Sequence, residues 1–273
     1  MTDMTDMIDM TGMNRVSLRT VRFRRLGGAC VVALALAMGT AQAAAPADAR
    51  ALVAAAIDLM RGTSSYSEMT MEVHRPDWQK SSTLVGWTRG REDALMRFTA
   101  PAKDAGNATL KLSRDMWTFA PKVNRVIRLP ASLMSQSWAG SDFSYNDLSR
   151  SDDLLVQYDL RLVATRTEDG HQVHEIEAIP HADAAVVWGK QVLRLRDDSV
   201  LLEETFYDQD MKPLKRLKAM AVGKLGGRMM ATRLRMTDLS EPDRYTEVTY
   251  KQLQFNVPVD AQRFTQFALR NQQ

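Results

Sequence analysis

Two neighbouring stretches differ in pattern from the rest of the chain. Asp115 to Pro130 reads DMWTFAPKVNRVIRLP, and Ser135 to Leu148 reads SQSWAGSDFSYNDL. In the first stretch, residues alternate in character on either side of a central proline, which predicts two strands joined by a turn. The second stretch has no regular period but contains three aromatic residues, Trp138, Phe143 and Tyr145. A solvated loop does not need three large amphipathic rings, so this segment is predicted to cover an apolar surface.

The N-terminal residues 1–43 have the pattern of a cleaved secretory signal peptide. A basic segment, Arg15 to Arg25, precedes an apolar run from Ala29 to Met38, and an Ala-Gln-Ala sequence at the end supplies the cleavage site. A run of about ten apolar residues is too short to span a bilayer, which argues against a membrane anchor. The acidic prefix before Met13 is atypical of such signals, so Met13 is the predicted start. The sequence therefore predicts export to the periplasm and one mature domain, residues 44–273.

The charges of the chain are nearly balanced, with 36 Lys and Arg against 33 Asp and Glu. Nucleic-acid-binding domains concentrate basic residues, so this balance argues against a nucleic-acid partner. Cys30 is the only cysteine in the sequence, and it lies in the predicted signal peptide. The mature chain is therefore expected to have neither a disulfide nor a thiolate metal site. A domain without cysteine suits an oxidising compartment such as the periplasm.

The residue types that most often carry catalysis do not form a recognisable site. His171 and His174 are the best metal candidates, but residues three apart on a strand point to opposite faces. Ser141 and Asp142 have no histidine nearby in the chain and are more typical of a turn than of a hydrolase. The sequence contains no His-Glu-x-x-His motif, nucleophile elbow or phosphate-binding glycine loop. It predicts a protein without catalytic residues, metal or cofactor.

Apolar periodicity indicates one helix followed by a long series of strands. A helix is predicted over residues 46–61, and about ten or eleven strands then follow one another with short turns. Short connections favour an antiparallel sheet over a parallel α/β fold. Arg233 and Arg235 lie on one side of their strand, which predicts a solvated outer face and an apolar inner face. The helix, a second short helix from Asp260 and the segment around Trp138 are predicted to cover that inner face, leaving a tight core or a cavity.

Several stretches of the chain resemble the LolA-like outer-membrane lipoprotein-sorting proteins. The matching residues are Met116–Pro121, Arg125–Pro130 and Gln136–Leu148, with Phe98–Pro101 and Asp104–Gly106 upstream. The resemblance covers essentially the whole mature chain, and Gly140–Leu148 is its most specific part. Within the family, the chain is most similar to the branch associated with RND-type (MMPL-like) exporters.

The resemblance implies a mainly β fold with α-helices (α+β), a half-open antiparallel β-barrel with a helical lid over a hydrophobic cavity. It also implies a non-catalytic periplasmic carrier that binds lipoprotein acyl chains or free lipids and passes them towards the outer membrane. An inner-membrane RND/MMPL-type transporter is the implied partner, and the protein is expected to be a monomer. The alternative is an accessory subunit of such an exporter, with a filled core and no ligand of its own.

The predicted ligand contacts lie on apolar strand faces and in the aromatic segment. Methionine is unbranched and adapts to varied apolar ligands, which favours the strand methionines as cavity residues, although ordinary core packing explains them equally well. The predicted cavity and lid residues are Met71, Met96, Phe98, Trp117, Phe119, Leu133, Met134, Trp138, Phe143, Tyr145 and Leu148. The resemblance does not identify which arginine, if any, holds the lid.

Overall fold

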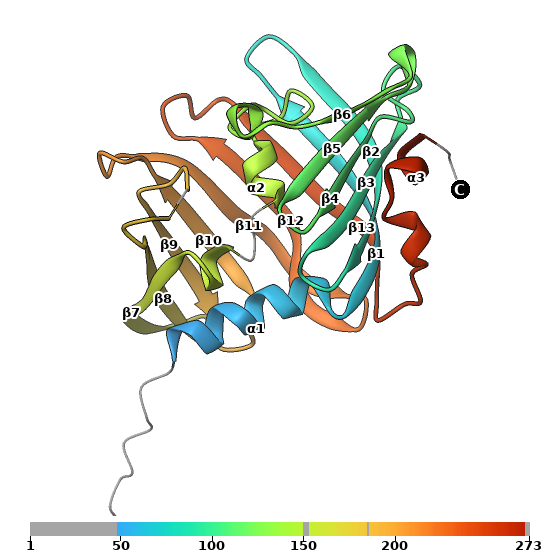
Figure 1. Ribbon diagram of the computed structural model, residues 1–273. Helices are drawn as coiled ribbons and strands as arrows, with labels where there is room; N and C mark the ends of the chain where they lie inside the picture. The colour runs from blue at the N-terminus through green and yellow to red at the C-terminus, as the bar shows by residue number, and fades with distance from the viewer. Residues whose placement is uncertain (1–47, 150–152, 185, 271–273) are drawn as a thin grey trace, which may run out of the picture. The chain divides into compact units, whose positions relative to one another are not determined.

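The computed structural model describes residues 48–149, 153–184 and 186–270, all within one compact unit. The predicted signal peptide, residues 1–43, lies outside the described residues. In the part of the chain that is described, 13 strands form a single antiparallel sheet (Figure 1). The strands are β1 (Ser64–His74), β2 (Gln79–Arg89), β3 (Asp93–Ala100), β4 (Ala108–Leu112), β5 (Asp115–Ala120), β6 (Arg125–Arg128), β7 (Tyr158–Glu168), β8 (His171–Pro180), β9 (Lys190–Arg196), β10 (Leu201–Tyr207), β11 (Pro213–Leu225), β12 (Arg228–Asp238) and β13 (Tyr245–Phe255).

The strand order across the sheet is β6-β5-β4-β3-β2-β1-β13-β12-β11-β10-β9-β8-β7. Two meanders, β1 to β6 and β7 to β13, are therefore joined where β1 pairs with β13. The edge strands β6 and β7 do not pair with each other, so the sheet curls without closing. This topology confirms the predicted half-open antiparallel β-barrel.

The sheet has 13 strands, more than the ten or eleven expected from the sequence, and β4 accounts for part of the difference. Its sequence, ATLKL, is short and lacks a strict alternation of apolar and polar residues. The structure gives the reason, because four of its five residues are buried. A strand that is covered on both faces loses the alternation that reveals a half-buried strand.

The helix α1 (Ala49–Arg61) packs against the inner face of the second meander. Asp48 caps it by accepting a hydrogen bond from the backbone N–H of Arg50 at 3.0 Å, and Gly62 ends it with a φ of 62°. Val53 and Ala56 are buried together with residues of β7, β8 and β9, as the helical period of apolar residues predicts. In the described residues, no helix combines the length and apolar character needed to cross a membrane.

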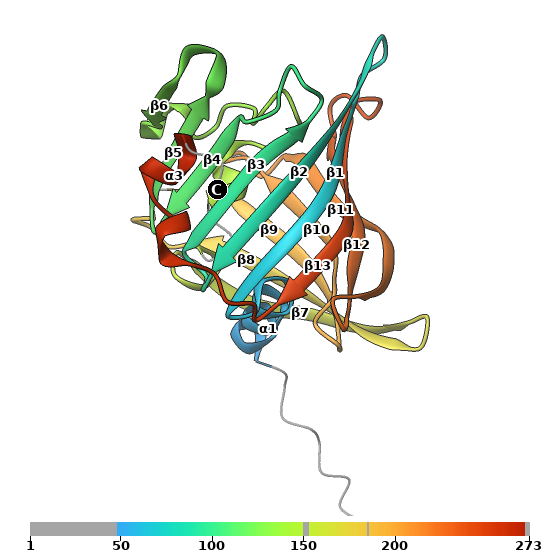
Figure 2. The same cartoon turned by 90° about the vertical axis from the view of Figure 1, so that its right-hand side faces the viewer.

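The C-terminal helix α3 (Gln266–Arg270) occupies a different place from the one predicted. It lies against the outer surface of β4 and β5, as Figure 2 shows, and does not cover the inner face. Phe264 and Leu269 are buried against Leu110 and Trp117 on that outer surface. Arg97, also facing outward, donates hydrogen bonds to the carbonyl oxygens of Ala268 and Leu269 at 2.9 and 3.3 Å. The first meander is therefore apolar on both faces. The prediction that the outer face is solvated is wrong for this part of the sheet.

The outer face of the second meander is charged, as predicted. Arg235 lies 2.7 Å from Glu247, and Arg194 lies 2.5 Å from Glu168. Leu193, beside Arg194, is buried in the inner cluster with α1, so the face opposite these ion pairs is apolar. Alternation along each strand places the charges in solvent and the leucines inside.

Candidate functional site

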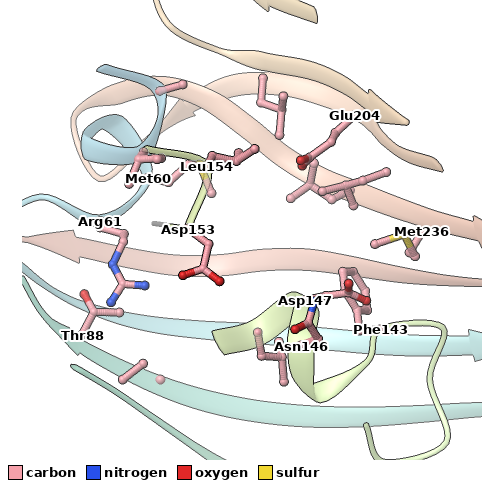
Figure 3. Close-up of a pocket in the computed structure, with 18 of the residues that line it drawn as sticks. Met60, Arg61, Thr88, Phe143, Asn146, Asp147, Asp153, Leu154, Glu204 and Met236 are labelled. Atoms are coloured by element: carbon pink, nitrogen blue, oxygen red, sulfur yellow. The ribbon is translucent and has the colours of Figure 1, made fainter. Parts of the chain in front are cut away.

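The inner face of the sheet borders a cavity of about 340 Å³, shown in Figure 3. This volume falls in the range of about 300–1,000 Å³ that is typical of small-molecule sites. The walls come from both meanders, from α1 and from α2 (Tyr145–Ser149), which lies in the connection between β6 and β7. The apolar lining residues are Val53, Ala56, Ile57, Met60, Met69, Trp87, Leu95, Met96, Phe143, Leu148, Leu154, Val186, Trp188, Leu193, Leu195, Leu201, Phe206, Leu217, Leu234, Met236 and Leu253. A cavity with this lining is suited to an alkyl chain.

The aromatic segment contributes to the cavity from one side and to the core from the other. Phe143 and Leu148 line the cavity. Trp138 is only 4% exposed and packs against Phe98, with ring centroids 5.4 Å apart. Its indole N–H donates a hydrogen bond to Thr109 Oγ1 at 3.0 Å, so the buried ring has no unsatisfied polar atom. Trp138 therefore anchors the segment to the sheet, and Phe143 and Leu148 of the same segment face the cavity.

A buried ion pair fixes the same segment to β1 and β13. Arg75 Nη1 lies 3.0 Å from Asp142 Oδ2, and both side chains are less than 10% exposed. Arg75 Nη2 also donates to the carbonyl oxygen of Gly140 at 3.2 Å, and the hydroxyl of Thr246 donates to Asp142 Oδ2 at 2.6 Å. Arg75 is thus the arginine that holds this segment in place, a residue that the sequence did not identify.

The turn residues of the segment have structural contacts. Ser141 Oγ donates to the carbonyl oxygen of Trp138 at 2.7 Å and is buried. The backbone N–H of Asp142 donates to Thr246 Oγ1 at 3.0 Å. These bonds agree with the expectation that Ser141 and Asp142 shape a turn.

The predicted site residues are divided among four places. Met96, Phe143 and Leu148 line the cavity. Met71, Phe98, Trp138 and Tyr145 form the adjoining cluster, in which Met96, Phe143 and Leu148 also take part. Trp117 and Phe119 lie on the outer surface under Phe264, and Leu133 and Met134 precede α2 without reaching the cavity. Trp117 and Phe119 alternate with inward-facing residues of β5, so their strand position places them outside.

Four charged side chains also line this apolar cavity: Arg61, Asp147, Asp153 and Glu204. Figure 3 shows the carboxyl group of Glu204 pointing into the cavity from β10. Asp147 accepts a hydrogen bond from the backbone N–H of Ser144 at 2.7 Å and lies 3.4 Å from Lys215 Nζ. Arg61 donates to the carbonyl oxygens of Gly90 and Asp93, each at 3.1 Å.

Glu204 is the least compensated of these charges. The residue is 9% exposed, and among the described residues none forms a hydrogen bond or ion pair with it. Burial, with a further contribution from the negative charge of Asp147, raises the pKa of Glu204 to about 8. The carboxyl group is therefore mostly protonated at neutral pH.

The raised pKa of Glu204 predicts a pH-dependent stability. The folded state holds this proton up to about pH 8, whereas an exposed glutamate loses it near 4.5. Between these values the folded state binds this proton and the unfolded state does not, so the contribution of Glu204 to the free energy of unfolding falls as pH rises, by about 1.4 kcal/mol per pH unit. Thermal unfolding of the parent protein and of Glu204→Gln, measured between about pH 4.5 and pH 8, tests this prediction. The stability of Glu204→Gln relative to the parent protein should increase with pH. A difference in stability that does not change with pH would contradict the raised pKa of Glu204.

An open, curled antiparallel sheet around an apolar cavity is the architecture of the LolA-like proteins, and solved structures agree. A DUF1329 family protein from Desulfovibrio piger matches with a TM-score of 0.74 and 23% identity, covering 81% of this chain and 97% of that one. An outer membrane lipoprotein-sorting protein domain from Vibrio parahaemolyticus has a TM-score of 0.71 and 22% identity, covering 82% and 100%. A LolA superfamily protein from Nitrosomonas europaea has a TM-score of 0.68 and 20% identity, covering 81% and 99%.

These structures show that the chain has the LolA-like fold. A family model described as "-like: Uncharacterized protein" matches residues 90–271, more than half of the chain, and the chain belongs to that family. No curated protein matches the chain.

Proposed function

We propose that the protein is a non-catalytic carrier that holds the acyl chain of a lipid or lipoprotein in its cavity. The observation that carries this proposal is the space of about 340 Å³ left open between the sheet, α1 and α2, with a lining that is largely apolar. An ordinary core would be filled by its own side chains at crystal-like density. An apolar cavity of this size is therefore best explained as the binding site of an apolar ligand.

The energetics suit reversible carriage. Burying one methylene group releases about 0.8 kcal/mol, so ten methylene groups would release roughly 8 kcal/mol. Ordering the chain and the protein on binding offsets several kcal/mol of this gain. The remaining free energy favours binding without making release impossible, which a carrier requires.

Two observations support transport between membranes through the periplasm. The N-terminal residues have the pattern of a secretory signal peptide. One solved structure with the same fold is described as a lipoprotein-sorting domain. Neither names the cargo of this chain, so the proposal includes both lipoprotein acyl chains and free lipids. The relatives described above do not point to an exporter partner, and the proposal does not include one.

The alternative, an exporter subunit with a filled core, is less well supported. It predicts that side chains of the protein occupy the space inside the sheet. In the described residues, this space is instead an open cavity. The carrier is therefore the better supported function.

Filling the cavity should weaken ligand binding strongly with little loss of stability. Leu234 lines the cavity and is flanked by the outward-facing Arg233 and Arg235, so Leu234→Trp places an indole in the ligand space. We expect the affinity for decanol, a neutral ten-carbon chain, to fall at least about tenfold, or 1.4 kcal/mol. Displacement of Nile red, an uncharged apolar dye, measures this affinity.

The control for this substitution is Val163→Trp, which adds the same side chain at an exposed position of β7. Val163→Trp should leave decanol binding unchanged. Equal binding by the parent and by Leu234→Trp, with both proteins folded, would show that the cavity does not hold the ligand.

A further inference from the structure

The unpartnered carboxyl group of Glu204 is not explained by acyl-chain binding alone. An apolar chain would be held as well by leucine at this position, and a buried carboxyl group without a partner costs free energy. Glu204 lies on β10 between Leu193 of β9 and Leu217 of β11, both of which line the cavity. The sequence therefore places one acid in the middle of an apolar wall. Figure 3 shows that its carboxyl group faces the ligand space.

Two further acids, one arginine and two tyrosines complete the titratable lining of the cavity. Asp147 comes from α2, Asp153 from the 3-10 turn Asp153–Leu155, and Arg61 from the end of α1. Tyr158 of β7 and Tyr250 of β13 are the remaining titratable lining residues. Once Glu204 is ionised, three carboxylates line the cavity against one guanidinium group, whose Nε and Nη2 donate to backbone carbonyl oxygens.

Lys215 lies outside the lining and compensates only part of this charge. Its ammonium group donates to the carbonyl oxygen of Asp142 at 3.0 Å and lies 3.4 Å from Asp147. It also lies over the ring of Trp188, 5.7 Å from the centroid. No contact links Lys215 to Glu204 in the described part of the chain. A positive charge brought by a ligand would therefore meet Glu204 and Asp147 together.

We propose that the cavity selects amphiphiles with a positively charged head group, an ammonium group, and that Glu204 binds this head group while the alkyl chain occupies the apolar walls. This inference rests on the proposed carrier function and adds to it a class of ligand. A cation placed beside Glu204 gains a charge-assisted contact in a low-dielectric site, where such contacts are strongest. A carboxylate head group would be repelled by the negative charge of Asp147, which already raises the pKa of Glu204, so fatty acids are disfavoured.

The same arrangement explains the raised pKa of Glu204. Without a ligand, burial and the charge of Asp147 favour the protonated carboxyl group. A bound cation favours the ionised form, so binding releases the proton from Glu204. The empty carrier thereby avoids an uncompensated buried charge, and the acid becomes an anion when its partner is present.

Three ligands with the same ten-carbon chain test the proposal in the full mature protein, each below its critical micelle concentration. They are decyltrimethylammonium, which has a fixed positive charge, decanol, which is neutral, and decanoate, which is negative. Displacement of Nile red gives the three dissociation constants. We expect decyltrimethylammonium to bind at least about tenfold more tightly than decanol, and decanoate at least about tenfold more weakly, which is 1.4 kcal/mol each way.

The substitution Glu204→Gln should remove the preference, bringing the ratio of the ammonium and decanol affinities to within about threefold of unity. Glu203→Gln is the matched control, because Glu203 is the preceding residue of β10, faces the other side and lies 3.5 Å from Arg216. This control should keep the full preference of the parent protein.

The possible results separate the two proposals. Equal binding of decyltrimethylammonium and decanol by the parent protein would overturn the inference and leave the carrier function standing. Failure of all three ligands to bind would count against the carrier function itself. A preference that survives in Glu204→Gln would show that Glu204 is not the head-group site, and loss of the preference in Glu203→Gln would overturn the assignment in the same way.

Discussion

Replacing Trp138 by alanine is expected to lower the free energy of unfolding by about 3–5 kcal/mol, the usual cost of removing a buried tryptophan. The indole is 4% exposed, packs against Phe98 and donates to Thr109 Oγ1 at 3.0 Å. The substitution leaves a void and an unsatisfied hydroxyl group. Urea denaturation of the parent and the variant measures the difference.

One control separates the ring of Trp138 from its hydrogen bond, and a second tests the effect of burial. Trp138→Phe keeps an aromatic contact with Phe98 and loses the N–H, so its cost should be about 1–2 kcal/mol. Trp78→Ala removes the same side chain at a position that is 47% exposed and should cost less than about 1 kcal/mol. A loss below 1 kcal/mol in Trp138→Ala would show that the segment is not anchored as described.

The second large effect is expected at the buried ion pair. Asp142→Ala leaves the guanidinium group of Arg75 buried beside backbone carbonyl groups without its carboxylate, and such changes cost about 3–5 kcal/mol. The double variant Arg75→Met, Asp142→Ala removes both charges and should be less destabilised than the sum of the two single changes. A double-mutant cycle by urea denaturation measures this coupling.

An exposed pair provides the comparison. Asp115 lies 2.5 Å from Arg128, and both side chains are about half exposed or more. Asp115→Ala should cost less than about 1 kcal/mol, since exposed ion pairs contribute little. Equal effects at the two pairs would contradict the view that burial makes the contact between Arg75 and Asp142 important.

Both predictions concern the same segment, which carries Phe143 and Leu148 to the cavity. Its position depends on Trp138 at one end and on Asp142 in the middle. The arrangement suits a wall that must remain in place whether or not a ligand is bound. The anchoring residues face the core, and the ligand-facing residues come next in the sequence.

Alternation of apolar and polar residues was sufficient to predict most of the sheet. Strands such as β1, in which Met69, Met71 and Val73 alternate with more exposed residues, are recognisable because one face is buried and the other is partly wet. The pattern fails at β4, which is covered on both faces. It also gave no indication that α3 packs outside, because an amphipathic helix does not specify which of two apolar faces it covers.

The site was predicted less completely than the fold. The aromatic segment contributes Phe143 and Leu148 to the cavity, but most of the lining comes from the second meander and from α1. Which leucines border a cavity depends on the curvature of the sheet, and curvature is set by contacts far apart in the sequence. Trp117 and Phe119 illustrate the difficulty, since their size suggested a ligand contact and their strand position places them outside.

Glu204 did have a signal in the sequence. Glu203 and Glu204 are adjacent in a strand, so their side chains must point to opposite faces. One of the two acids had to face the apolar side. The inward acid could therefore have been expected from the strand assignment alone, although its lack of a partner could not.

Native mass spectrometry of the mature protein, purified from cells that produce it naturally, tests the carrier function most directly. The cavity predicts a population heavier than the polypeptide by the mass of one amphiphile, which should be absent from Leu234→Trp prepared in the same way. A parent protein that carries no added mass, and that binds none of the ten-carbon ligands, would contradict the account.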